Sequence, residues 1–199
     1  MLTQCHGAGA ASPWVRRWSH LVAAPASVLD VACGHGRHLR WFAARGHPVV
    51  GVERDEKTLE SVADLAAAGH AELVHADIEN GPWPLMEGAR PRQFNAVVVT
   101  NYLWRPLVPV IIDSLAANGL LLYETFGAGN ASVGKPSRPD FLLTRGELLR
   151  ICAGLTIVAY EDGFCDNPAR FVQRIAAVRA AAGPSPGDAN AVTHLRYPL

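Results

Sequence analysis

Short apolar runs recur along this chain, and they alternate with stretches in which apolar residues return every three or four positions. The first pattern is typical of buried strands and the second of amphipathic helices. Strands are predicted from Val28 up to the glycines that follow it and over residues 48–52, 72–76, 94–100, 120–126, 155–160 and 171–178. Helices are predicted over residues 12–24, 37–45, 55–68, 107–117 and 144–152.

The order of these elements predicts the type of sheet. Strands and helices alternate through most of the chain, which favours parallel strands joined by crossover helices. The last two strands are joined by a loop with no helix between them, so we expect them to pair antiparallel. The pattern therefore predicts an α/β fold, a doubly wound and mostly parallel seven-stranded sheet with helices on both faces.

The length and the loops suggest how the chain is divided. With 199 residues, of which 49% are hydrophobic, the chain can bury one sizeable core. We expect a single domain over residues 1–182, with residues 12–24 as an N-terminal covering helix and residues 183–199 as a flexible tail. Residues 127–142 are rich in Gly, Ser and Pro and show no apolar period. Such a long irregular loop is expected to act as a lid, although it could also be a plain surface loop.

Composition excludes several classes of protein. Lys plus Arg and Asp plus Glu are 18 each, so no net charge attracts nucleic acid or an anionic membrane. The four cysteines lack metal-ligand spacing, which argues against a zinc site or a disulfide framework. The N-terminus has no signal-peptide pattern, and no run of eighteen apolar residues occurs. We expect a cytoplasmic protein without a membrane segment or a metal.

Three successive predicted strands end in residues that suit a ribose-bearing ligand. The first runs into Gly34 and Gly36, which let backbone approach a ligand closely. The second ends on Glu53 and the third on Asp77. Carboxyl ends of parallel strands share one edge, where doubly wound folds bind ligands. A G-x-G turn alone is weak evidence, because many tight turns carry glycines for steric reasons.

These residues resemble the class I S-adenosylmethionine-dependent methyltransferases, especially the small bacterial tellurite-resistance-type branch. The similarity covers about residues 27–179. The family signature D-x-G-x-G-x-G is matched by Asp30, Gly34 and Gly36, while Ala32 replaces the first glycine. The resemblance implies a sheet of order 3-2-1-4-5-7-6 with the last strand antiparallel. It also implies methyl transfer from S-adenosylmethionine to an acceptor by in-line displacement.

The resemblance also implies which residues contact the cofactor. The turn holds the methionine end, Glu53 accepts from the ribose hydroxyls, and Asp77 with Ile78 contacts the adenine. The full expected set is Asp30, Ala32, Gly34, Gly36, Glu53, Arg54, Asp77, Ile78 and Asn101.

Candidates for catalysis follow the first turn and the fourth strand. His38, Tyr102 and Arg105 are the predicted catalytic residues: the first two could move a proton, and Arg105 could pair with an anionic acceptor. His35 and Glu124 are further candidates. Each has a plainer interpretation, such as a surface histidine, a packing aromatic or a surface ion pair.

Two other functions fit parts of the sequence. A nicotinamide-dependent oxidoreductase would need a third glycine where Leu39 stands and an S/Y-x-x-x-K pair, which is missing. A non-catalytic S-adenosylmethionine-binding regulatory module would keep the same glycines and acids. The segment after the fourth strand does not match the N-P-P-Y signature of nucleic-acid enzymes. We therefore expect a small-molecule acceptor and a monomer or homodimer.

Overall fold

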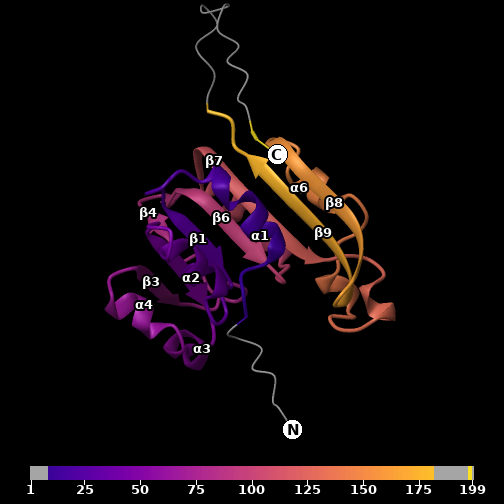
Figure 1. Ribbon diagram of the computed structural model, residues 1–199, viewed down its shortest axis with the longest axis horizontal. Helices are drawn as coiled ribbons and strands as arrows, with labels where there is room; N and C mark the ends of the chain where they lie inside the picture. Colours follow the sequence, from indigo (N-terminus) through magenta and orange to yellow (C-terminus); the bar gives the residue numbers. More distant parts are fainter. Residues whose placement is uncertain (1–8, 182–196, 199) are drawn as a thin grey trace, which may run out of the picture.

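A computed structural model describes residues 9–181 and 197–198. At its centre lies one seven-stranded sheet of order β3-β2-β1-β6-β7-β9-β8 (Figure 1). Neighbouring strands from β3 to β7 run parallel, whereas β9 is antiparallel to both β7 and β8. The strands are β1 (Val28–Val31), β2 (Val49–Glu53), β3 (Ala71–His75), β6 (Phe94–Thr100), β7 (Leu115–Phe126), β8 (Thr156–Asp166) and β9 (Ala169–Val178). The predicted fold class and strand order are confirmed, since the remaining strands form only a separate two-stranded hairpin.

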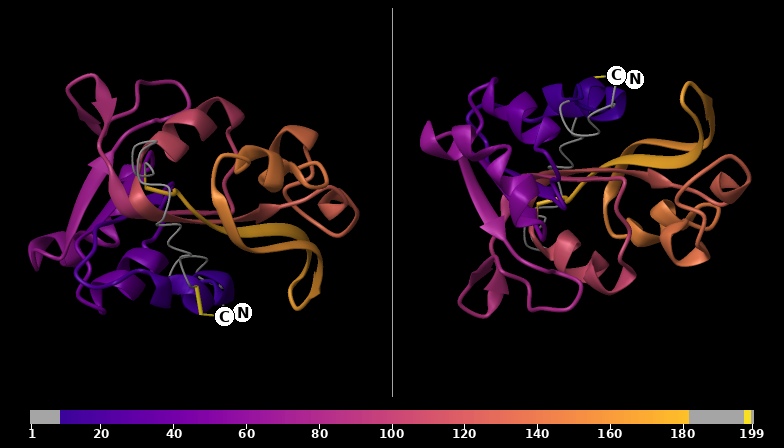
Figure 2. Two further views of the ribbon diagram at one scale, coloured as in Figure 1. Left: turned by 90° about the horizontal axis from the view of Figure 1, so that it is seen from above. Right: turned by 90° about the horizontal axis from the view of Figure 1, so that it is seen from below.

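Helices cover both faces of this sheet (Figure 2). On one face lie α1 (Pro13–Trp18), α2 (Arg37–Ala43), α3 (Glu56–Glu60) and α4 (Ala63–Ala67). On the other lie α5 (Val108–Asp113) and α6 (Glu147–Ile151). Alternate residues of β6 separate the two cores: Val97 and Val99 pack toward α5 and α6, whereas Ala96 and Val98 pack toward α1 and α2. Burial on both faces explains why such strands appear in the sequence as continuous apolar runs.

The N-terminal helix begins as the sequence predicts. The Ser12 Oγ accepts a hydrogen bond from the backbone N–H of Trp14 at 3.1 Å, and Pro13 occupies the first turn. Trp14 and Trp18 are buried against the sheet, and the Trp14 indole donates to the carbonyl of Ile175. The helix continues as η1 (Ser19–Leu21) and ends before residue 24. Its tryptophans thus cover one face of the sheet.

Two predicted helices differ from those observed. The helix predicted over residues 107–117 begins as η2 (Arg105–Leu107) and ends at Asp113, because Leu115 already pairs with Phe94 at the start of β7. The helix predicted over residues 55–68 breaks into α3 and α4 at Val62. Val62 is fully buried there and packs closely on Gly36, so tertiary packing overrides the helical pattern.

Two connections on the second face lack long helices. The segment between β3 and β6 is irregular except for a short hairpin of β4 (Met86–Glu87) and β5 (Arg90–Pro91). Its Leu85 is buried in the core. Residues 127–142 contain the short turns η3 (Asn130–Ser132) and η4 (Pro139–Phe141). The last hairpin is longer than predicted, because residues 161–166 of β8 also pair with β9.

Most of the predicted tail, residues 183–199, lies outside the described residues. Of the two described positions, Tyr197 packs against the core on the α1 and α2 face of the sheet, and the carbonyl of Pro198 is 3.1 Å from Nε2 of His20. Within residues 9–181 and 197–198, no helix combines the length and the apolar character needed to cross a membrane.

Candidate active site at the carboxyl edge of the sheet

A cavity of about 210 Å³ lies where β1, β2 and β3 end. Its walls contain residues from all three strand ends and from the segment after β6. The lining residues are Ala32, Val52, Glu53, Arg54, Ala76, Asp77, Ile78, Glu79 and Tyr102. The structure therefore brings together six of the residues predicted from the sequence. Glu79 was missed, although its position two residues after a strand-end acid was a signal.

The turn after β1 owes its shape to three residues in the left-handed region. Ala32, Gly34 and Gly36 have φ values of 52°, 54° and 66°. A Cβ on Gly36 would lie 2.6 Å from Cγ1 of Val62, so this glycine is needed for packing as well as for conformation. A Cβ on Gly34 would meet nothing within 4 Å. The turn is thus open on the side of Gly34 and closed at Gly36.

Glu53 ties this turn to the end of β2. Its carboxylate accepts hydrogen bonds from the backbone N–H of Gly34 at 3.1 Å, of Arg54 at 2.8 Å and of Asp55 at 3.0 Å. A carboxylate has about four lone-pair directions, so three N–H donors leave room for one more. Glu53 can therefore hold the turn and still accept from a hydroxyl in the cavity.

Asp77 and Tyr102 face the cavity in different ways. The Asp77 carboxylate accepts from the side-chain amide of Asn80 and the backbone N–H of Glu79, and these bonds lower its pKa. The Tyr102 hydroxyl is buried and has no hydrogen-bond partner among the described residues. Burial and the nearby Glu79 carboxylate raise the pKa of Tyr102, so its phenol stays protonated at neutral pH.

His38 lies behind the turn and does not line the cavity. Its side chain is 2% exposed, with Nδ1 3.6 Å from the buried carboxylate of Asp30. Its Nε2 is 3.3 Å from the backbone N–H of Ser12. Because an N–H can only donate, Nε2 must be the acceptor, and the ring proton then sits on Nδ1 toward Asp30. His38 and Asp30 thus connect β1, α2 and the N-terminal segment.

The same network continues to the end of β7. The Ser12 hydroxyl donates to the buried carboxylate of Glu124 at 2.9 Å, and Glu124 pairs with Arg174 at 2.5 Å. The Glu124 carbonyl also accepts from the backbone N–H of Asn101, which has a φ of 55°. Asn101 is exposed at the edge but does not line the cavity.

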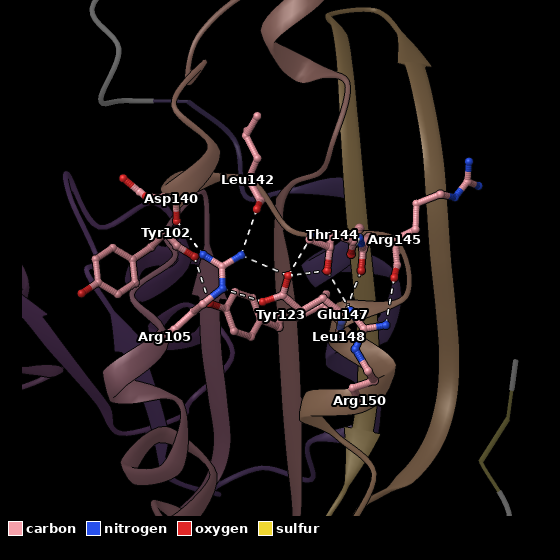
Figure 3. Close-up of polar contacts among 11 residues, drawn as sticks. Tyr102, Arg105, Tyr123, Asp140, Leu142, Thr144, Arg145, Glu147, Leu148 and Arg150 are labelled. Atoms are coloured by element: carbon pink, nitrogen blue, oxygen red, sulfur yellow. Dashed lines mark hydrogen bonds and ion pairs between the residues drawn. The ribbon is translucent and has the colours of Figure 1, made fainter.

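Arg105 points into the segment that follows β7 (Figure 3). Its guanidinium donates to both carboxylate oxygens of Glu147, at 2.7 and 3.0 Å, and to the carbonyls of Asp140 and Leu142. These four bonds use all but one of its five N–H groups. The ring of Tyr102, three residues earlier, points away from this cluster (Figure 3). Arg105 therefore contacts the segment after β7, whereas Tyr102 lines the cavity.

The cavity suits the cofactor that the sequence suggests. Ala32 of the glycine turn, the Glu53 carboxylate with its spare acceptor capacity, and Tyr102, whose hydroxyl is unpartnered, line one space. Ile78, which is buried, adds an apolar wall suited to a purine ring. A ligand with a sugar diol and an aromatic base would satisfy these groups.

Comparison with known proteins supports this assignment. Residues 28–117 match the family model described as "Methyltransferase domain". No curated protein sequence matches the chain. Among solved structures, the protein is similar to TehB from Haemophilus influenzae, with a TM-score of 0.64 and 17% identity over 83% of this chain and 61% of TehB. The chain thus spans less than two thirds of that protein.

Two further structures match over most of their length. An S-adenosylmethionine-dependent methyltransferase from Mesorhizobium loti has a TM-score of 0.65 and 15% identity, over 85% of this chain and 99% of its own. A TehB-like methyltransferase from Corynebacterium glutamicum has a TM-score of 0.60 and 18% identity, over 83% and 86%. At such low identity these structures support the fold.

The sequence motif, the family match and the sheet order agree. S-adenosylmethionine is accordingly the methyl donor, and residues 28–117 of the chain match the methyltransferase-domain family.

Proposed function

We propose that the protein methylates a small-molecule acceptor at the carboxyl edge of β1 and β6. The observation that carries the proposal is the cavity that Glu53, Asp77 and Tyr102 line together with Ala32 of the glycine turn. Its volume of about 210 Å³ suits part of a small ligand, and we assign it to the cofactor.

We assign the cofactor contacts from the geometry of this cavity. Glu53 accepts from the ribose hydroxyls with its remaining lone pair, and Gly34 lies under the methionine end. Ile78 packs on the adenine, beside Asp77. Arg54 and Ala32 complete the wall, and the Tyr102 hydroxyl hydrogen-bonds the bound cofactor. Asp30 and Gly36 shape the turn from behind, and Asn101 lies at its rim.

The residues act mainly by alignment. S-adenosylmethionine supplies an already activated methyl group, so a protein gains most by orienting the acceptor and excluding water. Tyr102 stays protonated at neutral pH and so donates a hydrogen bond instead of removing a proton. His38 is buried behind Asp30, and a catalytic role for it stays a prediction. This arrangement favours an acceptor that needs no strong base from the protein.

Calorimetry with S-adenosylhomocysteine tests the cofactor assignment. We expect Glu53→Ala to weaken binding about tenfold to a hundredfold, from about 1.5 to 3 kcal/mol for hydrogen bonds to a charged group. Glu53→Gln, which keeps the shape, should retain an intermediate affinity. The matched control is Glu87→Ala, an exposed acid on β4. Equal affinity in Glu53→Ala and wild type would refute the assignment.

The transfer itself is tested with isotopically labelled S-adenosylmethionine. The protein is incubated with a panel of thiols, amines, phenols, carboxylates and chalcogen oxyanions, and products are identified by mass. Transfer of the label to at least one small acceptor supports the proposal. Tight cofactor binding without transfer to any member would favour a non-catalytic binding module.

A further inference from the structure

A second depression lies beside the glycine turn, between the N-terminal segment and α2. It has a volume of about 320 Å³. Its lining residues are Gly9, Ala10, Ala11, Arg16, His35, Arg37, Arg40, Trp41, Ala44 and Arg45. This described lining holds four arginines and a histidine but no aspartate or glutamate. We call it the arginine groove.

Most of its positive charge is not neutralised within the described chain. Arg40 pairs with Asp64, which lies outside the groove, through two bonds of 2.7 Å. Among residues 9–181, no carboxylate lies within 4.0 Å of Arg16, Arg37 or Arg45. Concentrating like charges in one concave place raises the local concentration of anions. In a chain of zero net charge, this is a local feature that composition does not reveal.

The arginines are arranged around one aromatic ring. The Arg45 guanidinium lies 3.1 Å and that of Arg16 5.3 Å from the centroid of the Trp41 ring. Arg45 is also fixed by a hydrogen bond to the Trp41 carbonyl at 2.8 Å. The indole N–H of Trp41 is buried and has no acceptor among the described residues. Cations held beside a ring with an unused donor suit a carboxylate or phosphate attached to an apolar body.

One end of the groove reaches the edge where methyl transfer is proposed. Arg37 donates to the hydroxyl of Thr100, the last residue of β6, at 3.3 Å. His35 lies within the glycine turn, between Gly34 and Gly36. The groove and the cofactor cavity share no described lining residue, and the turn lies between them.

We infer that the arginine groove binds the anionic group, carboxylate or phosphate, of the methyl acceptor. The inference rests on the proposed function, since it names the acceptor class of the same site. It assigns the cationic role to Arg37, Arg16 and Arg45, because the guanidinium of Arg105 is used by Glu147 and two carbonyls.

Nuclear magnetic resonance of the full chain with S-adenosylhomocysteine bound tests the inference without turnover. The probe is phenyl phosphate, with phenol as its neutral match, and the signals followed are the Trp41 indole N–H and the arginine Nε–H groups. We expect phenyl phosphate alone to shift the Trp41 and Arg37 signals. Arg16→Gln and Arg37→Gln should each weaken its binding at least fivefold. The control Arg90→Gln, an exposed residue of β5, should bind like wild type.

Four results would overturn the inference. The first three are unchanged Trp41 and Arg37 signals, equal shifts with phenol, and equal loss of affinity in Arg90→Gln. A fourth is preferential methylation of the neutral members when the acceptor panel contains matched pairs such as 3-mercaptopropionate and 2-mercaptoethanol. Phenyl phosphate binding in the groove without methylation of any acceptor would instead count against the proposed function and leave the anion site standing.

Discussion

The guanidinium of Arg105 meets the carboxylate of Glu147 side-on, with Nε 2.7 Å from one oxygen and Nη2 3.0 Å from the other (Figure 3). The same guanidinium holds the carbonyls of Asp140 and Leu142, and Glu147 also accepts from Thr144. The Arg105 guanidinium thus attaches the end of the segment over residues 127–142 to the turn after β6. The expected lid is tied down at this end.

Removing the guanidinium should loosen this segment. We expect Arg105→Ala to lower the free energy of unfolding by about 1–2 kcal/mol, between the values of an exposed ion pair and of buried hydrogen bonds to a charge. The Arg105 side chain is 40% exposed and that of Glu147 13%. Hydrogen exchange of residues 140–147 should accelerate, and chemical denaturation gives the free energy.

A control lies in the same segment. Arg138 pairs with Asp140, but both side chains are about 70% exposed, so Arg138→Ala should cost less than about 0.5 kcal/mol. Equal exchange rates in Arg105→Ala and wild type would show that the segment is held by other contacts.

The Arg105–Glu147 pair should also respond to pH. Burial tends to raise the pKa of Glu147, but the hydrogen bonds from Arg105 and Thr144 outweigh it, and the net pKa lies below the ordinary value of 4.5. A lowered pKa in the folded state stabilises the protein above pH 4.5, and this contribution is lost as pH falls through the lowered pKa. Glu147→Gln should therefore melt below wild type at pH 6–7, and the two should converge in acid. A difference in melting temperature that persists unchanged at pH 3 would contradict this.

Ala32 is strained where the family signature has glycine. Its φ of 52° is a left-handed conformation that costs an L-residue roughly 1–2 kcal/mol. Glycine removes this strain but loses more entropy on folding, about 0.5–1 kcal/mol. We expect Ala32→Gly to leave stability unchanged or raise it by about 1 kcal/mol in chemical denaturation. Ala66→Gly in the exposed part of α4 should instead lose about 0.5–1 kcal/mol. A loss at Ala32 as large as that at Ala66 would argue against strain.

The sequence predicted those parts of the site that follow directly from strand order. Glu53 ends β2 and Asp77 follows the end of β3, its parallel neighbour in the sheet, so their positions along the chain already place them at one edge. The glycine turn is similar, because left-handed backbone selects for residues such as Gly34. Local pattern and topology agree at these positions, and the prediction needed no knowledge of side-chain packing.

The residues whose surroundings were not foreseen depend on distant partners. Arg105 contacts Glu147, which is 42 residues further along, and the two are joined by an irregular segment with no period to predict. Ser12 is the N-cap of α1, a role that its position before Pro13 indicates. Its hydrogen bond to Glu124, 112 residues further along, could not be predicted in this way. The break at Val62 has the same origin, since only the folded turn at Gly36 gives that side chain its place. Pairings of this kind arise from tertiary packing and leave no mark in the local pattern.

Tyr102 gives the sharpest test of the cavity. Tyr102 lines the cavity, and its buried hydroxyl has no hydrogen-bond partner among the described residues, so we expect the free protein to gain little from it. Tyr102→Phe should therefore keep or slightly raise stability, yet weaken S-adenosylhomocysteine binding about twofold to tenfold, the equivalent of one net hydrogen bond of about 0.5–1.5 kcal/mol. Burial and Glu79 raise the pKa of Tyr102. The pH dependence of the wild-type methyl-transfer rate should therefore show no change caused by ionisation of this phenol between pH 6 and 9.

The matched variant is Tyr160→Phe, which should reverse this pattern. The Tyr160 hydroxyl lies outside the cavity and bonds to the carboxylate of Asp162 at 3.1 Å and to the amide oxygen of Gln173 at 3.3 Å. Its removal should lower stability by about 1 kcal/mol and leave cofactor affinity unchanged. If Tyr102→Phe instead loses stability but binds S-adenosylhomocysteine like wild type, then the Tyr102 hydroxyl stabilises the fold and does not contact the cofactor.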